Sequence, residues 1–381
     1  MSEYKLWYQQ PAVEWTDALP LGNGRLGAMV FGGIKNERVA LNDDTLWSGS
    51  PGQNDYYANI HKNSVYDKVR NLLSEGDYEG AHQLIHGNWM GRVVNCYQPL
   101  GDLRFEQLLD GEIQNFQREL HLSTGISTVA FKSDGVLYTR EYLTSAPHQV
   151  LGIHFTASEP GELNLSFQLD SPHPFSVDES GGSLWMMGQA PSLAIRYPVK
   201  VLEKIAGLKH EKYPEVFDEH DSIRENLELV QYEGGKGIRF IACMQCNHVG
   251  GNIRTNDSKL IVEGADEVTI YLAVDTNYCG FDTIPTEGYP VLRDRTNAVL
   301  HTVSNAGWDT VRDAAISDHA QYFSRVDLVL DDDEDFSSLP TDKRIRNFDG
   351  TKDLGLISLL FQYGRYLMIA GSRPGTQPLN L

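Results

Sequence analysis

Residues 18–49 read ALPLGNGRLGAMVFGGIKNERVALNDDTLWSG, and this stretch says more about the fold than any other part of the chain. Five of its glycines lie close together: Gly22, Gly24, Gly27, Gly32 and Gly33. Glycines at this density mark backbone that bends sharply, approaches another segment closely or takes a positive φ. One interpretation is a tight β-hairpin with a polar turn. The other is a cleft wall, in which polar residues 42–45 and the Trp47 indole face a polyhydroxylated ligand. The spacing leaves both open.

The composition is that of an ordinary globular protein and limits the choice of partner. The chain has 381 residues, of which 22% are charged and 41% hydrophobic. Its formal net charge of −20 disfavours nucleic acids and anionic membrane surfaces, because both attract basic proteins. A neutral sugar is indifferent to this charge. The 18 tyrosines and 6 tryptophans suit stacking on sugars, and they suit a β-rich core equally well.

The first fifteen residues, MSEYKLWYQQPAVEW, have no basic segment followed by an apolar run. We therefore predict a cytoplasmic protein without a secretory signal. No segment approaches about 20 continuous apolar residues, so we predict no membrane span.

The cysteines predict neither a metal site nor a redox site. They are Cys96, Cys243, Cys246 and Cys279. Cys243 and Cys246 have the CxxC spacing, but they lie in a strand-like run, 238–246. Residues three apart on a strand point to opposite faces, so this pair cannot ligate one metal. No second Cys or His pair completes the motif. We predict a protein that needs no cofactor.

Alternating apolar residues predict a large antiparallel β sandwich over the first two-thirds of the chain. Apolar side chains occupy every second position in 151–155, 163–169, 238–242 and 268–274, which is typical of strands with one buried face. Turn-rich breaks such as Glu159-Pro160-Gly161 separate several of these runs. This pattern favours antiparallel pairing.

Helical spacing appears once early in the chain and then dominates its last part. Residues 63–86 predict a helical excursion broken at Gly76, and 291–303, 308–326 and 353–370 predict further helices. The wide apolar arc of the last segment predicts burial among other helices, which the remaining residues cannot supply.

Two polar segments interrupt these patterns. We interpret residues 192–235 as a surface excursion rather than a functional loop over a site. The acidic run 331–335 predicts a solvated linker or edge.

Six sequence blocks in order resemble glycoside hydrolase family 95, the α-L-fucosidase family, which also contains some α-L-galactosidases. They are the opening glycine block, LNDDTLWSG (41–49), YQPLGDL (97–103), REL (118–120), TREYLTSAP (139–147) and LLFQYGRYLMIAGSRPGTQPLNL (359–381). The resemblance implies a mainly β fold, with an N-terminal β-supersandwich at 2–283. A helical linker at 284–335 and the first helix of an (α/α)6 catalytic barrel, incomplete at 336–381, would follow.

The resemblance also implies an inverting mechanism acting on a fucosylated oligosaccharide or related glycan. In the family a glutamic acid protonates the leaving oxygen, and an asparagine pair assisted by an aspartate activates water. These groups belong to the helical barrel, and no position of this sequence matches them. We therefore assign no catalytic residue and expect the chain alone to be inactive. Three alternatives stay open: a non-catalytic carbohydrate-binding or scaffold fragment, an α-L-galactosidase, or a product that works beside a separate chain carrying the rest of the barrel.

Candidate substrate-binding residues lie in the opening block, since the sandwich could supply one wall of a cleft at a domain junction. They are Asn42, Asp43, Thr45 and Trp47, with Arg25 as an orienting group. Each also has a structural explanation: turn capping for the polar residues and core packing for the indole. For Arg365, beside Tyr363 and Tyr366 in the last helix, we favour an interdomain ion pair or a stacked guanidinium.

Overall fold

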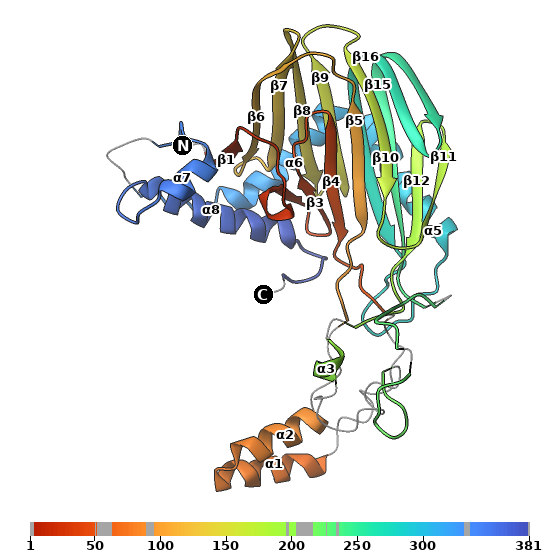
Figure 1. Ribbon diagram of the computed structural model, residues 1–381, viewed down its shortest axis with the longest axis vertical. Coiled ribbons are helices and arrows are strands. Elements are labelled where there is room, and N and C mark those ends of the chain that lie inside the picture. The colour runs from red at the N-terminus through yellow and green to blue at the C-terminus, as the bar shows by residue number, and fades with distance from the viewer. Residues whose placement is uncertain are drawn as a thin grey trace.

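The computed structural model describes residues 4–49, 51, 63–88, 95–195, 198–202, 216–225, 227–233, 236–330 and 336–379. The strands are β1 (Lys5–Tyr8), β2 (Leu19–Gly22), β3 (Leu26–Val30), β4 (Asn36–Asp43), β5 (Gly101–Gln107), β6 (Ile113–His121), β7 (Ile126–Ser133), β8 (Val136–Ser145), β9 (Val150–Ala157), β10 (Leu163–Asp170), β11 (Phe175–Ser180), β12 (Ser183–Gln189), β13 (Leu193–Ala194), β14 (Val230–Gln231), β15 (Arg239–Asn256) and β16 (Lys259–Thr276). The helices are η1 (Trp15–Asp17), α1 (Asn63–Glu75), α2 (Tyr78–Asn88), α3 (Val199–Leu202), α5 (Tyr289–Ala306), α6 (Trp308–Phe323), α7 (Thr341–Asn347) and α8 (Leu354–Gly371). Figure 1 shows one curled β body, with α7 and α8 to one side, α5 at the opposite side and α1–α2 projecting from one end.

Strand β16 organises the sheet. The main order is β1-β6-β7-β8-β9-β16-β10-β5-β4-β3-β2, and every pair is antiparallel. One edge of β16 pairs with β10 over residues 260–265 and with β9 over residues 267–272. Its other edge pairs with β15, which leads on to β12 and β11. The sheet therefore forks at β16 into two layers that enclose the core.

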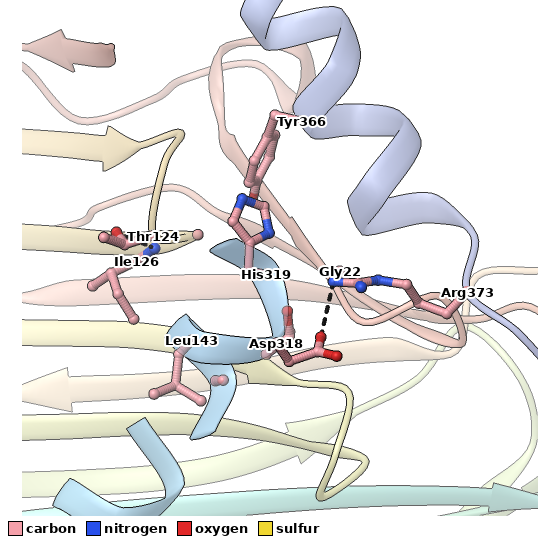
Figure 2. Close-up of a pocket in the computed structure, with 11 residues that line it drawn as sticks. Gly22, Thr124, Ile126, Leu143, Asp318, His319, Tyr366 and Arg373 are labelled. Atoms are coloured by element: carbon pink, nitrogen blue, oxygen red, sulfur yellow. Dashed lines mark hydrogen bonds and ion pairs between the residues drawn. The ribbon is translucent and has the colours of Figure 1, made fainter. Parts of the chain in front are cut away.

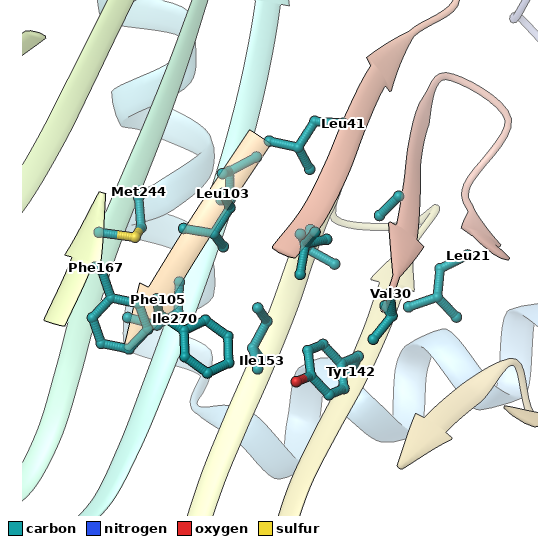
Figure 3. Close-up of a cluster of buried hydrophobic side chains, with 14 of the residues drawn as sticks. Leu21, Val30, Leu41, Leu103, Phe105, Tyr142, Ile153, Phe167, Met244 and Ile270 are labelled. Atoms are coloured by element: carbon teal, nitrogen blue, oxygen red, sulfur yellow. The ribbon is translucent and has the colours of Figure 1, made fainter. Parts of the chain in front are cut away.

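The core confirms the alternation seen in the sequence. In β10, Leu163, Leu165, Phe167 and Leu169 are all buried, while the residues between them are partly exposed. Figure 3 shows Leu21, Leu41, Leu103, Ile153 and Ile270 converging from different strands. Because the apolar faces of both layers meet here, the predicted mainly β fold, a large antiparallel sandwich followed by helices, is confirmed.

A buried guanidinium joins the two layers. Arg140, the arginine of the TREYLTSAP block, is 1% exposed and lies on β8. Its Nη1 and Nη2 donate to the carbonyl oxygens of Gly33 and Ile34, each at 2.5 Å, and Nη2 also donates to Gln107 Oε1 at 2.7 Å. Nη1 lies 3.7 Å from Glu37 Oε2. This arginine therefore fixes the β3–β4 turn against the opposite layer.

Glu37 is the buried partner of Arg140. Its Oε1 accepts hydrogen bonds from the backbone N–H groups of Gly32 and Arg38 at 2.9 and 3.0 Å, and its Oε2 accepts one from Tyr142 Oη at 3.1 Å. Burial raises the pKa of Glu37 to about 7, against the opposing effects of Arg140 and these donors. The carboxyl group is held in place by its hydrogen bonds, and its charge depends on Arg140.

Arg118, from the REL block, has a similar structural role. Its side chain donates from Nε to the carbonyl oxygen of Gln10 and from Nη1 to that of Asp17, both at 2.8 Å. Its guanidinium lies over the Tyr8 ring, 4.2 Å from the centroid. At Gly32, where φ is +73°, an added Cβ would lie 2.8 Å from Arg118 Cδ. The arginine thus requires a glycine beneath it.

The two faces of β15 separate the cysteines as predicted. Cys243 is buried in the cluster beneath α5 and α6, and Cys246 is buried in the core between the layers. Among the described residues, no group of three His, Cys, Asp or Glu side chains is arranged to hold a metal ion.

The helical predictions agree with the structure within a few residues. The excursion at 63–86 forms α1 and α2, and Gly76, at φ +80°, separates them. The segments predicted at 291–303 and 308–326 form α5 and α6, which cover the outer face of the sheet. α6 ends at Phe323 rather than Val326, because Arg365 donates to the carbonyl oxygens of Tyr322 and Phe323 and caps the helix there.

The two polar segments predicted from the sequence, 192–235 and 331–335, are only partly covered by the described residues. The acidic run 331–335 lies outside them, and the domain boundaries proposed at 283 and 335 stay predictions. Within 192–235, the described part contains β13, α3 and β14 and a small buried cluster of Leu202, Val216 and Phe217.

Helix α8 packs on the sandwich with one side only. Asp353 caps its start by accepting a hydrogen bond from the Leu356 N–H, and Arg344 donates two hydrogen bonds to the same carboxylate. The buried side places Leu359, Tyr366 and Ala370 in the sandwich core. This side of α8 is covered by the β2 region together with α6, so the prediction that the residues of this chain cannot bury the helix is wrong for that side. By length and composition alone, α8 is the one helix of the described residues that could cross a membrane, a property shared with core helices.

The other side of α8 is apolar and exposed. Leu360 and Met368 are 68% and 62% exposed, and Phe361 and Leu367 lie beside them. We expect the isolated chain to self-associate through this face, because contiguous exposed apolar surface drives association. Replacing Leu360 and Met368 together by glutamine should lower the average mass measured by light scattering and leave the melting temperature unchanged.

The matched control for this prediction is Leu359→Gln, since Leu359 is 4% exposed on the buried side of the same helix. This variant should lower the melting temperature, because it places an amide in the core. An unchanged mass for the double variant would show that association does not use this face.

Candidate functional site

The opening glycine block forms the hairpin of β2 and β3. Asn23 closes the turn, because its Oδ1 accepts from the N–H groups of Arg25 and Leu26 at 3.1 and 2.8 Å. Gly24 takes the positive φ of +93° that the turn requires. The hairpin of the first interpretation is observed, and the cleft wall of the second stays a prediction.

The glycines of this hairpin also contact the C-terminal end of α8. The Gly24 N–H donates to the carbonyl oxygen of Ala370 at 2.8 Å. An added Cβ at Gly22 would lie 2.5 Å from the Ala370 oxygen, and one at Gly24 would lie 2.7 Å from Arg373 Cβ. The missing side chains therefore let the helix approach the hairpin backbone directly.

A small cavity beside this contact has a buried arginine on its wall (Figure 2). Arg373 pairs with Asp318 at 3.1 Å between Nη2 and Oδ2, and it lies over the Tyr322 ring. His319 donates from Nε2 to the Leu122 carbonyl oxygen at 2.8 Å, and burial lowers its pKa to about 4. The cavity volume is about 10 Å³, which suits one water molecule and excludes a sugar. This cavity is a packing feature of the helix–sandwich contact.

Three of the predicted site residues, Arg25, Asp43 and Thr45, form one hydrogen-bonded network. Arg25 Nε donates to Asp43 Oδ2 at 3.0 Å, and Arg25 Nη2 reaches Asp275 Oδ1 at 3.3 Å. Asp43 is fully buried, and its Oδ1 accepts from the Thr45 hydroxyl at 2.5 Å. Burial disfavours the charge on Arg25, but Asp43 and Asp275 together raise its pKa. The network stabilises the loop after β4 and leaves Asp43 no exposed surface.

The other two predicted residues, Asn42 and Trp47, lie beside Tyr97. The Trp47 and Tyr97 rings are 5.1 Å apart between centroids at an interplanar angle of 55°. Trp47 Nε1 donates to the carbonyl oxygen of Asp44 at 2.9 Å, which fixes the indole. Burial raises the pKa of Tyr97 to about 12, although a hydrogen bond from Asn42 opposes this shift. An amide and two tilted rings thus form a partly exposed surface.

Asp44 connects this surface to the C-terminal segment. Its Oδ2 accepts from the backbone N–H of Gln377 at 2.9 Å. Its Oδ1 is buried without a hydrogen-bond partner among the described residues, and burial raises the pKa of the carboxyl to about 6. Asp44 and Tyr97 were not among the predicted site residues, although both lie within the sequence blocks quoted above. We refer to Asn42, Asp44, Trp47, Tyr97 and Gln377 as the junction site.

Arg365 belongs to the packing of α8 rather than to the junction site. Its guanidinium lies over the Phe323 ring, 5.1 Å from the centroid, and donates to Gln362 and to backbone carbonyl groups. Of the two explanations favoured from the sequence, the stacked guanidinium is observed.

The edge hairpin thus joins an antiparallel sandwich to the helical segment that contains α8. Two family models match the chain: "Glycosyl hydrolase family 65, N-terminal domain" over residues 6–280 and "Glycosyl hydrolase family 95 catalytic domain" over residues 307–381. The chain belongs to glycoside hydrolase family 95, of which it is an N-terminal portion.

Curated relatives agree with this assignment. The chain is 30% identical to "Alpha-L-fucosidase 2" of Arabidopsis thaliana, over 99% of this chain and 43% of that protein. It is 26% identical to "Probable alpha-fucosidase A" of Aspergillus niger, over 96% of this chain and 42% of that protein. The chain thus spans less than half the length of these relatives. Among solved structures, a "Putative kojibiose phosphorylase from human microbiome" matches with a TM-score of 0.49 and 11% identity, over 96% of this chain and 41% of that chain.

Proposed function

We propose that this chain is the N-terminal part of an α-L-fucosidase-type glycoside hydrolase that releases terminal L-fucose from oligosaccharides with inversion. The names of the curated relatives and the match to the family 95 catalytic domain support this substrate and reaction. Inversion requires a general acid and a general base about 6.5–9.5 Å apart, with room for a water between them. No residue of this sequence matches the family's acid, asparagine pair or aspartate, so the catalytic step needs groups from elsewhere.

The junction site gives the sandwich its part in this function. The observation that carries the proposal is the hydrogen bond from Gln377 to Asp44, because it joins the LNDDTLWSG block to the segment matched by the catalytic domain. Substrate pockets form preferentially at domain junctions. Trp47 and Tyr97 supply apolar ring surface, and Asn42 supplies an amide for hydroxyl groups. The sandwich would thus form one wall of the sugar cleft.

The first test is hydrolysis of p-nitrophenyl α-L-fucoside by the 381-residue chain alone. We expect no release of p-nitrophenol above the buffer rate, because an inverting pair is missing and its loss removes the chemistry rather than the affinity. Robust turnover by the chain would refute the assignment of catalysis to residues outside this sequence.

The second measurement addresses the junction site without relying on catalysis. Titration with L-fucose should show weak binding at the junction site, and Trp47→Ala should remove this component. Trp15→Ala is the control, because Trp15 is 56% exposed and lies in η1, outside the junction site. Equal affinities for the two variants would contradict a sugar-contacting role for Trp47.

A further inference from the structure

A second hollow lies where the β11–β12 turn, β15 and α5 meet. Its volume is about 390 Å³, within the range of 300–1,000 Å³ that is typical of small-molecule sites. In Figure 1 these elements lie at the side of the molecule opposite α8. None of its lining residues belongs to the junction site. We refer to it as the α5 groove.

Uncommitted polar side chains line the α5 groove. Gln245 extends from β15, and Asp294 and Asn297 extend from adjacent turns of α5. Within the described part of the chain, these three side chains make no hydrogen bond or ion pair. Ser180 and Ser183 add hydroxyl groups from the β11–β12 turn. Amides and hydroxyls both donate and accept, while the carboxylate accepts, which matches the mixed needs of sugar hydroxyls.

The remaining wall is rigid and its charge is compensated. Trp185 is 6% exposed, and the Arg293 guanidinium lies over its ring, 4.6 Å from the centroid. Arg293 Nη1 is also 3.2 Å from Asp178 Oδ2. Its positive charge is therefore neutralised, and Asp294 makes the groove unfavourable for anions. A neutral ligand is not repelled by the Asp294 carboxylate.

Helical geometry separates the α5 groove from the Arg25–Asp43–Asp275 network. Arg293 and Asn297 are four residues apart and share one face of α5. Arg295 lies on the opposite face and joins Asp275 at 2.6 Å, the same carboxylate that Arg25 contacts. One face of α5 thus borders the groove, and the opposite face borders this ion-pair network.

We infer that the α5 groove is a second, non-catalytic binding site for a neutral saccharide of one or two sugar units. This site does not depend on the proposed hydrolysis, because its lining lies entirely within the sandwich and α5. It would hold a glycan at the enzyme surface while the junction site contacts the sugar to be released.

Isothermal titration of the full chain with L-fucose, D-galactose and lactose tests this inference. Gln245→Ala combined with Asn297→Ala should weaken saccharide binding at the groove at least tenfold. Asn305→Ala should leave it unchanged, because Asn305 is exposed about two turns further along α5 and outside the groove. Matching melting temperatures for these variants would show that the double substitution does not act through unfolding.

Trp47→Ala separates this inference from the proposed function. Saccharide binding that survives Trp47→Ala and is lost in the groove double variant supports the α5 groove. Binding that disappears only in Trp47→Ala would overturn the groove and leave the junction site intact. No binding of any of the three sugars at tens of millimolar would also overturn it.

Discussion

Replacing Arg140 by alanine is expected to lower the free energy of unfolding by about 3–5 kcal/mol, the usual result of removing one partner from a buried ion pair. The substitution leaves the Glu37 carboxylate buried without its counter-charge and removes the donors to the Gly33 and Ile34 carbonyl groups. Urea denaturation followed by circular dichroism at pH 7 measures the change. A loss of this size would show that the TREYLTSAP block serves the sandwich rather than the chemistry.

Three further variants make the interpretation specific. Arg104→Ala, at an arginine that is 40% exposed and paired with Asp102, should cost less than about 1 kcal/mol, as exposed ion pairs do. Arg140→Met with Glu37→Gln should be more stable than Arg140→Met alone, because a glutamine needs no counter-charge. If the double variant were the less stable one, the ion pair would not explain the effect.

The stability deficit of Arg140→Ala, meaning its loss of unfolding free energy, should depend on pH because of Glu37. Burial raises its folded pKa to about 7 even beside Arg140, and removing Arg140 can only raise it further. When the pKa of a carboxyl is higher in the folded than in the unfolded state, the protein loses stability as the pH rises from the unfolded-state pKa to the folded-state pKa. The deficit should therefore be larger at pH 8 than at pH 5. A deficit independent of pH would show that the lost hydrogen bonds dominate.

Much of the sandwich could be predicted because its signal is local. Alternation in 163–169 predicts a strand with one buried face without any knowledge of its neighbouring strands, because one buried face imposes a period of two. The same rule places Arg140 inward between Tyr138 and Tyr142, but an arginine there contradicts the expected apolar side chain. Its partners lie on the β3–β4 turn, more than 100 residues away in sequence, and no periodicity specifies that contact.

The junction site shows the same limit. Asn42, Asp43, Thr45 and Trp47 could be singled out because they are contiguous with the glycine block. Tyr97 joins them through the ring contact with Trp47, and Gln377 joins them across 333 residues. The sequence also did not distinguish the buried Asp43 from the junction carboxylate of Asp44, because the two are adjacent and chemically identical.

Gly22→Ala is expected to destabilise the docked α8 by about 1–3 kcal/mol, the usual cost of forcing an extra methyl group into a packed contact. The new Cβ would lie 2.5 Å from the carbonyl oxygen of Ala370, which is backbone and cannot rotate away. The helix must therefore shift, which lengthens the hydrogen bond from the Gly24 N–H to the same oxygen. Limited proteolysis should cut the variant faster in the segment after α7, and thermal unfolding should begin at a lower temperature.

Gly27→Ala is the matched control, because Gly27 lies in the same hairpin and an added Cβ there meets only ordinary contacts, the nearest at 3.8 Å. It should leave proteolysis and melting near the parent values. If both substitutions acted alike, the glycine block would serve hairpin formation alone. If only Gly22→Ala loosened α8, the block would be a docking surface for the helical segment. The Gln377–Asp44 hydrogen bond follows that helix in the chain, so the junction site would loosen with it and L-fucose binding should weaken in the same variant.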